Sequence, residues 1–111
     1  MANKQYRNKE HLIWVKQRRC TIDNHCSGLV EAHHLLKPFD GSRGMGMKAN
    51  DKNAIPLCQK HHTLLHTKFG TEANLFKHFG LHEATGMVKA ESLWNESPHN
   101  SNNSEDDGLP F

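Results

Sequence analysis

Apolar positions along the chain predict a short series of alternating helices and strands. Leu12, Ile13 and Val15 stand among basic residues and predict a helix over residues 9–19. Two short apolar segments bounded by glycine, proline or polar residues predict strands over residues 29–36 and 53–58. Pro56 confines the second strand to a sheet edge or a strand end.

The second half of the sequence predicts further helices. A helix is expected over residues 59–67, and Thr71 has the residue type of an N-cap for a helix that ends at Gly80. One or two more helical turns are expected over residues 83–94. Three residues at helical spacing are expected in the core, with Trp94 covering it: Leu75, Phe76 and Phe79.

Composition and charge divide the chain in two. Residues 1–94 hold all 14 lysines and arginines against 8 acidic residues, whereas residues 95–111 hold four acidic residues and no lysine or arginine. We therefore predict one α+β domain over residues 1–94 that binds a polyanion, followed by a disordered acidic tail over residues 95–111. No apolar run approaches the roughly 20 residues of a membrane span, and the N-terminus resembles no secretory signal, so the expected location is cytoplasmic.

Cysteine and histidine usage predicts metal binding. A domain of this size gains much from a structural metal, and three cysteines cannot all pair within one chain. A cysteine pair followed about thirty residues later by Cys-x-x-His predicts a closed structural Zn²⁺ site, with His25 as an alternative ligand. Its ligands are Cys20, Cys26, Cys58 and His61. The competing interpretation is three cysteines without a metal.

A second group predicts a separate divalent-metal site. His62 and His66 are four residues apart on the predicted helix, so both imidazoles project from one face. His33 and His34 are adjacent on a predicted strand and point to opposite sides. One of these two can therefore bind the ion while the other faces a substrate as a base.

The segments "EAHHL", Asn53 and "LCQKHHTLLH" resemble an HNH, or ββα-metal, nuclease. The arrangement is similar to the nuclease domains of DNase colicins. It is closer still to small phage and prophage HNH proteins related to the recombination-enhancement, RecA-dependent nucleases. The resemblance implies a DNA endonuclease that acts in phage DNA processing or recombination, with a RecA-type recombinase as a possible partner.

The same resemblance assigns roles to individual residues. It makes His34 the general base that activates water, and Asn53 the residue that orients His34 through a backbone or side-chain hydrogen bond. It makes His33, His62 and His66 the ligands of one catalytic ion, which can be Mg²⁺, Mn²⁺, Ni²⁺ or Zn²⁺. Phosphodiester hydrolysis needs such an activated water and a cation at the phosphate.

Two further features suggest binding partners. Basic residues in and beside a glycine-rich loop are expected to contact DNA phosphates, namely Lys37, Arg43, Lys48 and Lys52, although a merely solvated loop would have the same composition. The terminal "SEDDGLPF" resembles the C-terminal tip of bacterial single-stranded-DNA-binding proteins. Phe111 is then expected to bind proteins that recognise such tips, and a solubilising tail is the alternative.

A different class of function also fits this pattern. A zinc-binding DNA-binding module without catalysis would keep the same fold and the Cys/His ligands. The presence of His34 together with Asn53 favours the enzyme, because a structural zinc fold needs neither residue.

Overall fold

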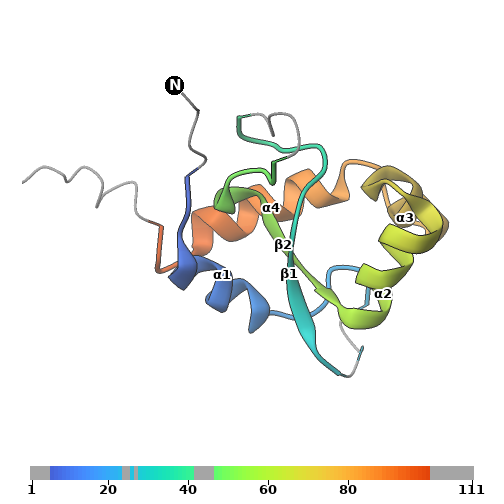
Figure 1. Cartoon of the computed structure of the whole chain (residues 1–111), viewed down its shortest axis with the longest axis horizontal. Coiled ribbons are helices and arrows are strands. Elements are labelled where there is room, and N and C mark those ends of the chain that lie inside the picture. The colour runs from blue at the N-terminus through green and yellow to red at the C-terminus, as the bar shows by residue number, and fades with distance from the viewer. Residues whose placement is uncertain (1–5, 24–25, 27, 42–46, 101–111) are drawn as a thin grey trace, which may run out of the picture.

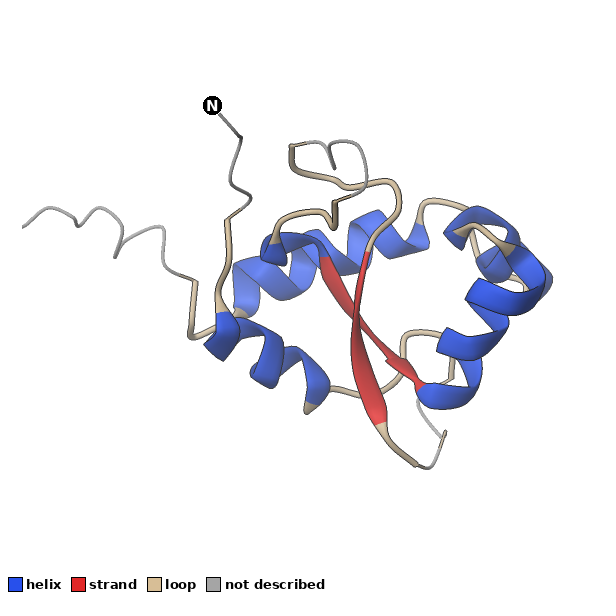
Figure 2. Cartoon of the chain, in the orientation of Figure 1, coloured by secondary structure: helices blue, strands red, loops and turns tan. Residues whose placement is uncertain are grey.

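The computed structural model describes residues 6–23, 26, 28–41 and 47–100. These residues form a small α+β domain in which a two-stranded antiparallel sheet lies among helices (Figures 1 and 2). In chain order the elements are α1 (Lys9–Lys16), β1 (Val30–His34), the 3₁₀ turn η1 (Asp51–Asn53), β2 (Ala54–Cys58), α2 (Gln59–Leu64), the π-helical turn η2 (Leu65–Phe69), α3 (Glu72–His78) and α4 (Thr85–Glu96). The α+β class expected from the sequence is confirmed.

Both strands lie within the predicted segments. The register pairs His33 with Ile55 and His34 with Ala54, so the two histidines lie at the end of β1 where β2 begins. Within the described part of the chain β2 pairs with β1 alone, so Pro56 is tolerated. The Pro56 carbonyl accepts hydrogen bonds from the backbone N–H and the hydroxyl of Thr21 at 2.9 and 2.8 Å. The segment between Cys20 and Cys26 is thereby tied to the outer edge of β2.

Helix α1 begins where its sequence signal begins but ends earlier than expected. The Asn8 side chain accepts a hydrogen bond from the backbone N–H of His11 and caps the helix. The last helical residue is Lys16 rather than Arg19. The chain then turns, which brings Cys20 back into the core.

The helix expected over residues 59–67 consists of α2 followed directly by the wider turn η2. Gly70 closes η2 in the left-handed region at φ 77°, and its N–H donates to the carbonyl of Leu65 at 2.7 Å. Such π-helical turns occur frequently at functional sites. Here the turn carries His66.

The core forms between the sheet, α3 and α4. Leu75 and Phe76 are fully buried and Trp94 is 4% exposed, as the sequence predicts. The prediction for Phe79 is wrong, because α3 ends at His78 and Phe79 is 39% exposed beside the ring of His61. Thr71 caps α3 by accepting a hydrogen bond from the N–H of Asn74, as predicted.

The boundary expected after Trp94 is also wrong. Helix α4 continues to Glu96, and Ser97 is buried against α1, where its hydroxyl lies 2.9 Å from Nδ1 of His11. Residues 95–100 therefore belong to the domain, while the remainder of the predicted tail, with Phe111, lies outside the described residues. Among the described helices, none combines the length and the apolar character needed to cross a membrane.

Candidate functional site

The structure brings together the four residues predicted to hold a structural metal. The possible ligand atoms of Cys20, Cys26, Cys58 and His61 all lie within 4.8 Å of one another. Nδ1 of His61 is 3.5 Å from Sγ of Cys20, 3.5 Å from Sγ of Cys26 and 3.2 Å from Sγ of Cys58. A tetrahedral zinc site with ordinary bond lengths places nitrogen and sulfur about 3.5 Å apart. The donor set and the spacing fit Zn²⁺.

The electrostatics of this Cys/His cluster favour a bound cation. Burial and the neighbouring sulfurs of Cys58 and Cys20 raise the pKa of Cys26 to about 12. Burial also acts to raise the pKa of Cys58, but hydrogen bonds outweigh it and lower that pKa; among them are backbone N–H groups at the start of α2. Adjacent thiolates repel one another, so a divalent cation is the natural means of holding three of them together.

The second predicted ligand group also comes together, from three elements. His33 of β1, His62 of α2 and His66 of η2 place possible ligand atoms within 4.8 Å of one another. Nδ1 of His33 lies 3.2 Å from Nε2 of His62. Two nitrogen ligands of a tetrahedral zinc ion stand about 3.3 Å apart.

Two carboxylates set the tautomers of two members of this histidine triad, His33 and His62. Nε2 of His33 donates to Oε2 of the buried Glu72 at 2.7 Å, and Nδ1 of His62 donates to Oε1 of Glu31 at 2.6 Å. The other nitrogen of each ring therefore carries a lone pair, and these lone pairs face each other. Carboxylates that orient metal-binding histidines in this way are a recurrent feature of metal sites.

The charged form of His33 is disfavoured. Burial lowers the pKa of His33, and the charges of His62 and His66 lower it further, against the opposing effect of Glu72. Neutral imidazoles that point lone pairs at one place form a site for a cation. Sequence reasoning missed Glu31 and Glu72, although Glu31 stands two residues before His33 and so lies on the same face of β1.

A groove of about 610 Å³ opens over this triad. One wall is α1, and the floor is β1 with the segment around Ala49. His34 lines the same groove as His33, His62 and His66.

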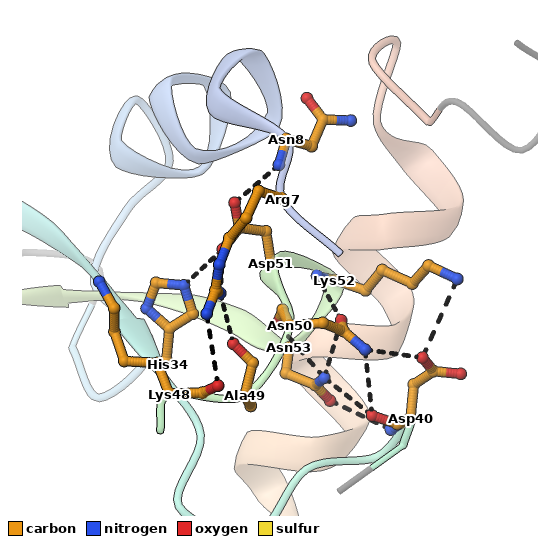
Figure 3. Close-up of polar contacts among 10 residues, drawn as sticks. All are labelled: Arg7, Asn8, His34, Asp40, Lys48, Ala49, Asn50, Asp51, Lys52 and Asn53. Carbon is orange, nitrogen blue, oxygen red and sulfur yellow. Dashed lines mark hydrogen bonds and ion pairs between the residues drawn. The ribbon is translucent and has the colours of Figure 1, made fainter. Parts of the chain in front are cut away.

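The ring of His34 is held by Asp51 (Figure 3). Nε2 of His34 donates to Oδ1 of Asp51 at 2.7 Å, and the same carboxylate accepts from Arg7 at 3.0 Å and from the backbone N–H of Asn8 at 2.7 Å. Burial acts to raise the pKa of Asp51, but these hydrogen bonds outweigh it and hold the pKa below its ordinary value. Asp51 is therefore an anion that fixes the Nε2–H tautomer of His34, which leaves the lone pair on Nδ1.

The expectation that Asn53 orients His34 is corrected by the contacts of the Asn53 side chain. Its buried side chain accepts from the N–H of Asp40 and donates to the carbonyl of Asp40 and to Oδ1 of Asn50 (Figure 3). It also accepts from the N–H of Phe39. Asn53 thus ties the loop after β1 to the start of β2. The turn η1 directs Asp51, rather than Asn53, toward His34.

The four basic residues expected at DNA have different environments. Lys48 lines the groove. Lys52 instead lies 3.9 Å from Asp40 and over the rings of Tyr6 and Trp94, because η1 turns it away from the histidines. Lys37 is exposed outside the groove, beside Glu72 and Glu83, and Arg43 lies outside the described residues.

Comparison with known proteins places the chain in a family. The sequence profile of the family described as "Protein of unknown function (DUF968)" matches residues 2–82. The chain belongs to this family. It is also similar to the "Uncharacterized protein YdfU" of Escherichia coli (strain K12), with 36% identity over an alignment of 80 residues that covers 64% of this chain. The match spans about a fifth (21%) of that relative's length. No solved structure matches the chain significantly.

Proposed function

We propose that this chain is a metal-dependent endonuclease of the HNH, or ββα-metal, type that hydrolyses DNA phosphodiester bonds. The observation that carries the proposal is the shared groove of His34 and the histidine triad, in which one imidazole is oriented by Asp51 and three others converge on one point. The order of β1, β2 and α2 is consistent with a strand–strand–helix metal fold.

His34 has the geometry of a general base. With Nε2–H bonded to Asp51, its Nδ1 lone pair accepts a proton from water while the water oxygen forms a bond to phosphorus and the bond from phosphorus to the leaving 3′-oxygen breaks. Asp51 stabilises the imidazolium formed and keeps the ring in one orientation. A divalent cation bound by His33, His62 and His66 would neutralise charge on the phosphate and on the leaving oxygen.

The Cys/His cluster has a different task in this proposal. Zn²⁺ bound by Cys20, Cys26, Cys58 and His61 would join the segment after α1 to the start of α2. His61 and His62 are neighbours, so fixing the first also fixes where the second projects. A structural zinc would thereby hold the histidine triad in place.

The test is cleavage of supercoiled plasmid and of single-stranded DNA by pure zinc-loaded protein, with added Mg²⁺, Mn²⁺, Ni²⁺ or Zn²⁺ in separate reactions. We expect nicking by the wild type, a loss of about 10²–10⁴-fold in His34→Ala, and full activity in the control His78→Ala, whose exposed ring lies outside the groove. Equal cleavage by the wild type and His34→Ala would contradict the proposal. DNA binding without cleavage under any of these conditions would favour the non-catalytic zinc module.

A further inference from the structure

Helix α1 presents one face to the groove of the histidine triad. Lys9, Leu12, Ile13 and Lys16 all line that groove, and their spacing of three, four and seven residues places them on one side of the helix. Figure 1 shows α1 beside β1, the strand that carries His33 and His34. A helix with no predicted part in the site therefore forms one wall of its groove.

This wall is positively charged and accessible to a ligand. Lys9 and Lys16 are exposed, and Lys48 contributes a third cation to the lining of the groove. Among the described residues, the ammonium groups of these three lysines form no ion pair with a carboxylate. Glu31, an acidic residue that lines the groove, is occupied by its hydrogen bond to His62.

The spacing of the two α1 lysines suits a run of phosphates. Seven residues of α-helix span about 10.5 Å, which is about three nucleotide steps of a stacked strand at roughly 3.4 Å each. Between the lysines lie Leu12 and Ile13, of which Ile13 is 45% exposed. An apolar strip flanked by cations fits the sugar and base surfaces of a strand whose phosphates meet the ammonium groups.

We propose that the α1 wall binds the sugar–phosphate backbone of a nucleic acid strand beside the catalytic centre, with Lys9 and Lys16 contacting phosphates on either side of Ile13. This inference rests on the proposed function and names where its substrate lies. The main phosphate contacts are then made by α1, 20 or more residues before Lys37 and Lys52, which the sequence had predicted for this role.

The test measures binding separately from cleavage. In the His34→Ala background, the Kd for a fluorescent DNA is measured by anisotropy between 50 and 200 mM KCl, with a single strand in one arm and a duplex in the other. Lys9→Ala/Lys16→Ala is compared with Lys68→Ala/Lys77→Ala, whose exposed lysines do not line the groove. We expect about tenfold weaker binding for the first pair and a salt slope reduced by about 1.4 for the single strand or about 1.8 for the duplex. The control pair should bind like the parent.

The DNA form, single strand or duplex, whose affinity falls more in Lys9→Ala/Lys16→Ala is the form that lies on α1. Equal affinity and equal salt slope for the two double variants would overturn the inference, even if the wild type cleaves DNA. Wild-type protein that cleaves no DNA would instead overturn the proposed function, and with it the identification of the strand as a substrate. Loss of affinity without loss of salt slope would also overturn the inference, because phosphate contacts must release counterions.

Discussion

Nε2 of His34 lies 2.7 Å from Oδ1 of Asp51, and this contact joins the last residue of β1 to the first residue of η1. The Asp51 side chain is 3% exposed and is held by Arg7 and by the backbone N–H of Asn8 (Figure 3). A buried anion with three donors cannot easily move, so it holds the imidazole in one orientation toward the groove.

We expect Asp51→Asn to lower kcat by about 10²-fold or more, with a much smaller change in KM. The amide no longer stabilises an imidazolium and can present its NH₂ group to the ring, which favours the wrong tautomer. Steady-state cleavage kinetics check this expectation, with Asp40→Asn as the control, because Asp40 bonds Asn50 and not His34. A folded Asp51→Asn protein with the kcat of the wild type would contradict the role given to Asp51.

Glu72 should control the affinity of the histidine triad for its metal. Glu72→Gln removes the negative acceptor for Nε2–H of His33, so we expect the affinity for Mn²⁺ or Ni²⁺ to fall about 10–100-fold. Isothermal titration calorimetry of zinc-loaded protein measures this change. Glu83→Gln, at an exposed position, is the matched control. Unchanged affinity in Glu72→Gln would show that the triad does not depend on the carboxylate.

Loss of a ligand residue should lower stability more at the Cys/His cluster than at the histidine triad, the two candidate metal sites. Cys58→Ser removes a buried ligand of the Cys/His cluster, so zinc content and melting temperature should fall together, since metal binding contributes folding free energy in a small domain. His62→Ala should abolish cleavage with a smaller loss of stability. Elemental analysis and thermal melting check both variants. Full zinc content and an unchanged melting temperature in Cys58→Ser would show that this cluster is not a structural site.

Acid should destabilise the domain through His11. Burial lowers its pKa from 6.5 to about 4, with Asp51 raising it and His99 lowering it to a smaller extent. Because the folded state binds this proton more weakly than the unfolded state, the stabilising contribution is complete above pH 6.5 and is lost as the pH falls from 6.5 to 4. The loss is of the order of 3 kcal/mol.

The measurement is urea unfolding of the wild type and of His11→Gln at several pH values between 7 and 4. The difference in the free energy of unfolding between the two proteins should shrink as the pH falls, because only the wild type must protonate a fully buried ring. For His78→Gln, at an exposed site, the difference in the free energy of unfolding from the wild type should stay constant over this pH range. A difference that stays constant across this range would exclude His11 as the source of acid sensitivity.

The sequence by itself determined those features that depend on neighbours in the chain. His62 and His66 share a helix face because four residues make about one turn, and His33 and His34 point apart because a strand alternates. Thr71 caps α3 through an N–H three residues away. These relationships hold in any fold that keeps the local structure, so the pairing of His62 with His66 could be predicted from spacing. The choice of His33 over His34 as the ligand came from the resemblance to HNH nucleases.

Only the tertiary structure decided which residues support those ligands. Asp51 reaches His34 across 17 positions of sequence through the turn η1, and Glu72, the first residue of α3, reaches His33 across 39 positions. Lys9 and Lys16 line the groove because α1 packs beside β1. Lys52, one residue after Asp51, instead lies near Asp40 and two aromatic rings. Such contacts depend on the direction in which distant elements pack, which residue spacing along the chain does not encode.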